Sequence, residues 1–171
     1  YCEARVWSYF NMFTARGNEF LPYILGDTDT PMPLFVKPNR KISVQDVKNA
    51  MRDHYEGTPL DISRDFGAGP YHTPYRLSPL SFKVGDKEYF NERPISTQQS
   101  GFVFVAQMRS TLPDAIGGVL WFGTDDANMT VFTPVYCCTD KVPVCYSRVD
   151  GADYITFSWN SSFWIFNWVS N

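Results

Sequence analysis

Apolar and polar residues alternate most regularly in the second half of the chain, where the pattern predicts β-strands. The cleanest alternation is GFVFVAQMR, and three other apolar segments resemble it; the four span residues 101–109, 117–126, 129–138 and 152–160. Turn-forming residues stand between or beside these segments: Asp114, Gly117, Gly118, Asp125 and Asp126. The pattern therefore predicts an antiparallel meander of about four strands, with helical segments at both ends.

The clearest predicted helix lies in residues 41–57, KISVQDVKNAMRDHYEG. Ser43 can cap its start, and Asp46 follows three residues later, which is a capping-box pattern. Apolar residues then recur with helical spacing, and Gly57 is placed to end the helix. His54 falls in this helix, where a single histidine is expected to be an ordinary surface residue.

Two segments of the first half have the composition of loops. Residues 21–39 are dense in Pro, Asp and Thr, and residues 57–80 carry three glycines and four prolines. A structured loop as long as residues 57–80 is often functional in a compact domain. Residues 2–13 mix helix and strand signals, and their sequence alone assigns them to neither.

Composition narrows the class of protein. The chain has 171 residues, 44% of them hydrophobic and 19% charged, which indicates a globular chain and a single domain over residues 1–171. A net charge of −3 gives no electrostatic reason to expect a nucleic-acid partner. No apolar run is long enough to predict a membrane span. The aromatic content, 17%, fits a β-rich core or a surface that stacks ligands.

Four cysteines are present: Cys2, Cys137, Cys138 and Cys145. Their spacing, with no histidine nearby, does not resemble a zinc site, and neither a metal nor a cofactor is expected. Buried free thiols are the favoured interpretation. The alternative is a disulfide that joins Cys145 to Cys137 or Cys138 across a turn at residues 139–143.

Polar side chains crowd residues 91–100, NERPISTQQS, just ahead of the first predicted strand. A strand does not require them, so they are candidates for a site.

Several ordered blocks of the chain resemble one family. They are YEGTPLD, GAGPYHTPYR, ERPISTQQSGFVFVAQMRSTLPDAIGGVLWFGTDDA, TVFTPVY and ITFSWNSSFWIFNWVSN. These blocks resemble the bacterial cysteine dipeptidases, relatives of the secernins among the N-terminal-nucleophile hydrolases. The resemblance implies an α+β fold, a four-layer αββα sandwich with antiparallel sheets. It also implies hydrolysis of dipeptides by a cysteine that opens the mature chain, whose own amino group serves as base.

The chain departs from that family at the nucleophile. Tyr1 precedes Cys2, and CEARVW resembles an internal block of the family, so a structural role is expected for Cys2. The other cysteines lie within a predicted strand and turn, without a free amine beside them. We therefore expect an incomplete dipeptidase domain that lacks its nucleophile and is inactive alone. No signal peptide is visible, and the compartment stays unassigned.

The resemblance suggests Arg93 as the catalytic residue of this chain, because an arginine beside the nucleophile favours the thiolate or binds a substrate carboxylate. The simpler alternative is an ion pair with Glu92. Ser96, Gln98 and Gln99 are candidates to donate hydrogen bonds to a peptide or an oxyanion. The alternative for these three residues is a polar strand edge without a role in the site.

For Asp125 and Asp126, a role in a hairpin turn is favoured over recognition of the substrate amine. A different class of function is also open, an aromatic-rich β module that binds peptide or sugar without catalysis. If the chain is an incomplete sandwich, we expect it to self-associate through exposed strand edges and apolar surface.

Overall fold

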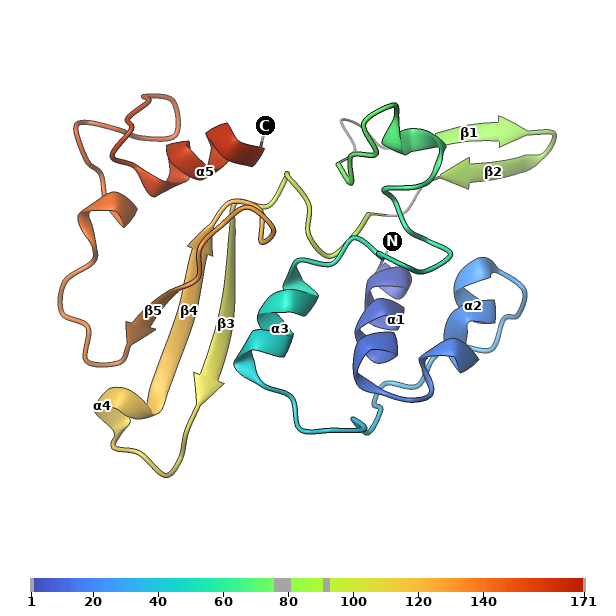
Figure 1. Cartoon of the computed structure of the whole chain (residues 1–171), viewed down its shortest axis with the longest axis horizontal. Helices are drawn as coiled ribbons and strands as arrows, with labels where there is room; N and C mark the ends of the chain where they lie inside the picture. Colours follow the sequence, from blue (N-terminus) through green and yellow to red (C-terminus); the bar gives the residue numbers. More distant parts are fainter. Residues whose placement is uncertain (1, 76–80, 91–92, 171) are drawn as a thin grey trace. The chain divides into compact units, whose positions relative to one another are not determined.

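The computed structural model describes residues 2–75, 81–90 and 93–170, which form a mixed helix-and-strand fold with antiparallel sheets (Figure 1). The predicted α+β class is confirmed. The chain divides into two compact units, Tyr1–Ile95 and Ser96–Asn171. Within the described ranges, no helix combines the length and the apolar character that a membrane crossing would need.

The first unit is mainly helical. It comprises α1 (Cys2–Phe13), a 3-10 turn η1 (Gly17–Phe20), α2 (Leu21–Leu25), α3 (Val44–Met51), η2 (Phe66–Ala68) and the hairpin β1 (Ser81–Val84) with β2 (Lys87–Phe90). Its core lies around α1, where Trp7 is buried against Tyr55 and Ile62. The indole of Trp7 donates a hydrogen bond of 3.0 Å to the carbonyl of Gly17, which holds the turn after α1.

The capping box predicted for α3 is confirmed. The Ser43 hydroxyl accepts from the amide of Asp46 at 3.1 Å, and the Asp46 carboxylate accepts from the amide of Ser43 at 2.8 Å. The predicted end of the helix is wrong, because α3 stops at Met51 and Tyr55 has a positive φ of 65°. The chain turns there to bury Tyr55 in the core, and burial of this large ring outweighs the continuation of one helical turn.

The loop prediction for residues 21–39 is wrong at its start, since α2 occupies Leu21–Leu25 before Gly26 ends it with a φ of 80°. The mixed segment at residues 2–13 forms α1. In residues 57–75 the only regular element is η2, as predicted for a loop; residues 76–80 lie outside the described part.

The second unit is built on a three-stranded antiparallel sheet. Its elements are β3 (Phe102–Met108), α4 (Asp114–Gly117), β4 (Gly118–Thr124), β5 (Thr133–Tyr136), η3 (Val144–Tyr146) and α5 (Ser162–Ser170). The strand order is β3-β4-β5, and Phe104 lies opposite Phe122 in the register. The alternation in β3 buries Val103 and Val105 on one face, as the sequence pattern predicts.

Two of the predicted strands differ in the structure. The segment 129–138 contributes only the four residues of β5, and residues 152–160 form no strand. In the latter segment the Asp153 carboxylate accepts hydrogen bonds from the amides of Ile155 at 3.0 Å and Thr156 at 2.8 Å. These bonds close a turn, which removes the amides that a strand would need for pairing.

Candidate functional site

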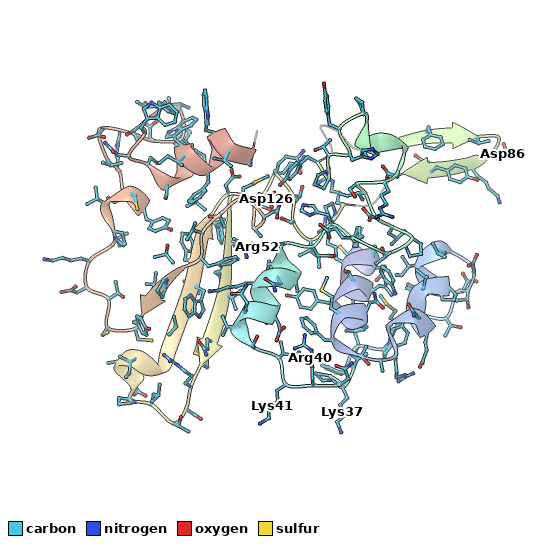
Figure 2. The ribbon with its side chains drawn as sticks, in the orientation of Figure 1. Lys37, Arg40, Lys41, Arg52, Asp86 and Asp126 are labelled. Carbon is cyan, nitrogen blue, oxygen red and sulfur yellow. The ribbon has the colours of Figure 1, made fainter. Side chains whose placement is uncertain are left out.

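A buried polar network in the second unit joins the segment before β3 to the segment after β4. The Ser96 hydroxyl, 1% exposed, donates a hydrogen bond to the Asp126 carboxylate and accepts one from the Asn128 amide at 3.0 Å. That amide also lies 3.3 Å from the same carboxylate oxygen of Asp126. Ser96 thus bonds to two residues that lie 30 and 32 positions further along the sequence. Figure 2 labels Asp126, which lies at the end of the sheet where β4 finishes.

Asp126 has a binding capacity that the described residues do not satisfy. The residue is 0% exposed, and its Oδ2 atom has no hydrogen-bond partner among the residues that the structure describes. A buried carboxylate oxygen without a donor is costly, and native proteins nearly always provide one. This oxygen therefore has the capacity to accept a further hydrogen bond.

Asp125 connects the same end of the sheet to α5. Its carboxylate accepts a hydrogen bond of 2.5 Å from the Ser170 hydroxyl, and its amide donates to the Gly101 carbonyl at 3.0 Å. Burial raises the pKa of Asp125; the Ser170 hydrogen bond opposes this shift, and the nearby charge of Asp126 adds to it. Asp125 lies, as predicted, in the segment that joins the paired strands β4 and β5, and it is 2% exposed there because its side chain and its amide hold two other segments.

The other predicted site residues lie outside this network. Arg93 belongs to the first unit, where its carbonyl accepts from the Tyr55 hydroxyl at 2.7 Å and from Arg5 Nε at 3.2 Å. Its proposed ion-pair partner, Glu92, falls outside the described residues. Gln99 is exposed and accepts a local hydrogen bond from the Thr97 hydroxyl, whereas Gln98 is half-buried. Of the predicted residues, the structure brings Ser96 and Asp125 to the same end of the sheet.

A cavity of about 300 Å³ lies beside Thr124, the residue just before this aspartate pair. It is open to solvent and is lined by Thr124 of β4, by residues in and after η3 and by the start of α5. The polar residues among its lining include Thr124, Ser147, Arg148, Asp153, Ser161 and Ser162. The volume is at the lower end of the range for small-molecule sites, which fits a ligand of a few dozen atoms at most.

A second cavity, of about 620 Å³, is lined by Phe157, Trp164, Asn167 and Trp168. Its aromatic residues belong to a larger cluster in which the Phe157 and Trp159 rings meet edge to face with centroids 4.8 Å apart. Trp159 and Trp168 remain 60% and 69% exposed. In this part of the chain several aromatic side chains therefore lie at the surface and not in a buried core.

The first unit contains a separate buried group that the sequence did not predict. His54 is 1% exposed, which corrects the expected surface position. Its Nδ1 lies 3.0 Å from Glu56 Oε1, and its amide donates to the same carboxylate at 2.8 Å. Burial raises the pKa of Glu56, but the hydrogen bonds from His54 outweigh it and leave that pKa below its usual value. Next to this pair, burial raises the pKa of Asp53, which accepts from the Ser8 hydroxyl at 2.6 Å.

All four cysteines are free and exposed, which corrects the expected burial of the thiols. The alternative disulfide of Cys145 is not formed. Cys2 is the first residue of α1, and Cys137 reaches the carbonyl of Gly118 with its sulfur at 3.7 Å.

The sequence favours a hairpin-turn role for Asp126, with recognition of the substrate amine as the alternative, and it did not single out Asn128, Ser170, Arg148 or Ser161 for the site. The signal that could have been used for Asp126 is its place directly after an apolar strand, where two successive carboxylates are unusual for a plain turn. Ser161 could have been found as a serine directly ahead of an apolar helical segment, whereas the contacts of Asn128 and Ser170 join segments distant in sequence.

Comparison with known sequences identifies the class. The sequence profile of peptidase family C69 matches residues 1–171 of the chain. A "Probable dipeptidase" of Salmonella dublin is 32% identical over 136 residues, which cover 80% of this chain and 26% of that protein. A "Probable dipeptidase B" of Lactococcus lactis subsp. lactis (strain IL1403) is 30% identical, covering 84% of this chain and 27% of that protein.

"Dipeptidase A" of Lactobacillus helveticus is 27% identical, covering 80% of this chain and 24% of that protein. No solved structure matches the chain. The chain spans about a quarter of the length of these curated relatives. These matches define the class of the chain as a member of a peptidase family. The chain belongs to peptidase family C69.

Proposed function

We propose that this chain forms part of a hydrolase that cleaves dipeptides, and that the second unit contributes one wall of its substrate site. The match of the whole chain to a peptidase family supports the activity, and the relatives named as dipeptidases support the substrate class. The observation that carries the site is the buried Asp126 carboxylate, whose Oδ2 faces no donor among the described residues.

In this proposal Asp126 accepts a hydrogen bond from the substrate, through its ammonium group or its peptide N–H. Ser96 and the Asn128 amide hold the other carboxylate oxygen, so the acceptor is fixed before the substrate arrives. Such preorganisation lowers the free-energy cost of orienting the substrate. Asp125 is a positioning residue, because its bonds to Ser170 and Gly101 fix the backbone that carries Asp126.

The nucleophile of this proposal is a cysteine other than the four in the chain. Cys2, Cys137, Cys138 and Cys145 are exposed, and none has a hydrogen bond to a histidine or a carboxylate among the described residues. Without such a base, or an amino group of its own, a thiol at neutral pH is mostly protonated. Arg93 remains a proposed aid to the thiolate, and Gln98 and Gln99 remain proposed donors to the substrate.

The proposed four-layer sandwich draws support from one face of the sheet. Phe102, Phe104 and Met108 alternate along β3 and are 61%, 50% and 81% exposed. Phe122 of β4 stacks on Phe102 with ring centroids 6.1 Å apart. In the complete fold a second sheet would cover this apolar face, and in the chain alone a second copy would cover it, hence the proposed self-association.

The test is dipeptide hydrolysis by the natural full-length polypeptide that carries this chain. Asp126→Asn should lower kcat/KM at least about tenfold, since a hydrogen bond to a charged group is worth roughly 1.5–3 kcal/mol. Asp86→Asn is the matched control, because Asp86 lies exposed in the turn between β1 and β2 (Figure 2). Equal activity of the two variants, or the absence of any dipeptide turnover, would contradict the proposal.

The cysteine assignment has its own test in the same assay. Replacing Cys2, Cys137, Cys138 and Cys145 together by serine should leave turnover in place, while iodoacetamide should still inactivate the enzyme by alkylating another cysteine. Mass spectrometry would locate that residue. Loss of turnover in the quadruple variant, with its circular dichroism unchanged, would place the nucleophile within this chain.

The aromatic cavity favours a second candidate, a non-catalytic module that binds peptide or sugar. Exposed Trp159 and Trp168 next to Phe157 offer faces on which an apolar side chain or a sugar ring can stack. Binding of an oligosaccharide or a longer peptide that Trp168→Ala abolishes, without hydrolysis of any dipeptide, would support this candidate over the first.

A further inference from the structure

We propose that the cavity beside Thr124 binds the carboxylate end of a peptide substrate, at the N-terminus of α5. The inference rests on the proposed dipeptidase function for the identity of the ligand. The cavity itself is defined by residues of the second unit alone.

The start of α5 provides the first set of donors. The Ile165 amide donates to the Ser161 carbonyl at 3.0 Å, which is the first bond of the helix. The amides of Ser162, Phe163 and Trp164 therefore precede the intrahelical ladder. Amides in this position, together with the helix dipole, attract an anion. Ser162 and Phe163 both line the cavity.

Ser161 provides an independent indication of a ligand. The residue is 7% exposed and lines the cavity, yet its hydroxyl makes no hydrogen bond with the residues that the structure describes. The hydroxyl of a serine in this capping position ordinarily bonds to the first turn of its own helix. Thr124 Oγ1, at the same cavity, is buried and has no hydrogen-bond partner among the residues that the structure describes, so these two hydroxyls are placed to donate to a bound oxygen atom.

Arg148 provides the positive charge of the site. It lines the cavity, its side chain is 72% exposed, and one guanidinium nitrogen lies 3.5 Å from the carboxylate of Asp153. A guanidinium has five donors in a planar fork, so this long contact leaves it able to bind a second carboxylate through two bonds. The arrangement favours a planar carboxylate that lies between the guanidinium and the start of the helix.

Asp153 also lines the cavity and opposes an anion there. Its carboxylate accepts from the amides of Ile155 and Thr156, and these bonds, followed by the Arg148 charge, keep the pKa of Asp153 below its usual value. The charge of Asp153 therefore weakens the attraction that Arg148 exerts on a ligand. Removing the charge of Arg148 should therefore weaken the binding of an anion, and removing the charge of Asp153 should strengthen it.

The probe is a dipeptide isostere in which a methylene replaces the scissile carbonyl, so that the enzyme cannot hydrolyse it. Its binding to the full-length polypeptide is measured by calorimetry, and compared with the same molecule carrying a C-terminal carboxamide. We expect the carboxylate to bind about tenfold more tightly than the amide, as a hydrogen-bonded charge predicts.

Substitutions then assign the preference to the cavity. Arg148→Gln and Ser161→Ala should weaken binding of the carboxylate, and Asp153→Asn, which keeps an acceptor for the two amides, should strengthen it. None should change binding of the carboxamide. Arg64→Gln, at an arginine of the first unit whose side chain is 81% exposed, is the matched control and should change neither. Unchanged circular dichroism of Ser161→Ala separates a lost contact from a lost fold.

Three results would overturn the inference: equal affinity for carboxylate and amide, an equal loss in Arg64→Gln, or inorganic phosphate bound as tightly as the isostere. The hydrolysis assay stands apart from these results. Turnover of dipeptides without the carboxylate preference would leave the proposed function in place and remove this site. Carboxylate preference without turnover would keep the site and remove the proposed function.

Discussion

Ser96→Ala is the substitution that tests the buried network most directly. The variant removes one hydroxyl that donates to the Asp126 carboxylate and accepts from the Asn128 amide. Asp126 would keep only the Asn128 amide, at 3.3 Å, among the donors seen in the described part of the chain. A buried hydrogen bond to a charged group contributes roughly 1.5–3 kcal/mol, so we expect a loss of about 2 kcal/mol in the free energy of unfolding.

A second variant separates the hydrogen bond from the buried charge. Asp126→Asn keeps the shape of the side chain and an acceptor for Ser96, and it removes a charge that is fully buried. We expect it to cost less than Ser96→Ala, because it leaves no ionised oxygen without a donor. In the Asp126→Asn background, Ser96→Ala should cost less free energy of unfolding than it does in the wild type. The difference, the coupling free energy of the double-mutant cycle, should be about 1 kcal/mol.

The assay is urea unfolding of the four proteins, followed by circular dichroism and by tryptophan fluorescence. Coincidence of the two probes establishes whether a single unfolding free energy applies to a chain with two compact units. A loss below about 0.5 kcal/mol for Ser96→Ala, or strictly additive effects, would refute the view that this serine fixes Asp126.

Three further predictions concern other parts of the chain. The raised pKa of Asp125 means that the folded state keeps a proton that the unfolded chain has lost, so stability should fall as pH rises from about 4 through that raised pKa. The Asp125→Asn variant has no such proton to lose, so its melting temperature should not show this fall and should approach that of the wild type only at low pH. A difference in melting temperature that stays constant across this pH range would contradict the prediction. Gly17→Ala should destabilise the chain by about 1–3 kcal/mol in urea, because its Cβ would lie 2.3 Å from Asn11 Cα, while Gly101→Ala meets no atom and should cost less. Phe104→Ser should reduce self-association of the 171-residue chain in analytical ultracentrifugation, and an unchanged sedimentation profile would exclude this sheet face as the contact.

Local chemistry explains the elements that sequence predicted correctly. The cap of α3 needs only Ser43 and Asp46, which lie three residues apart, so both partners are visible in one short stretch. The alternation in β3 is visible in the sequence because successive side chains of a strand point to opposite faces of the sheet, and only one of these faces is buried here.

The failed predictions have a common cause in competition between local pattern and distant contacts. The apolar pattern of residues 152–160 suggests a strand, but the Asp153 side chain binds the amides that pairing would need. The helical spacing that reaches Tyr55 is equally valid locally. Burial of that ring against Trp7, with its hydroxyl on the Arg93 carbonyl, takes the chain out of the helix instead.

The candidate site shows the same division. Sequence alone singled out Ser96 and Asp125, because polar residues at strand ends are visible as a break in an apolar pattern. Only the tertiary structure decided that Ser96 bonds to Asp126, that Asp125 bonds to Ser170, and that Ser161 lines a cavity. The physical reason is that hydrogen bonding and spacing along one strand or helix are set by neighbouring residues. Burial and the pairing of polar groups depend on which distant segments the folded chain brings together.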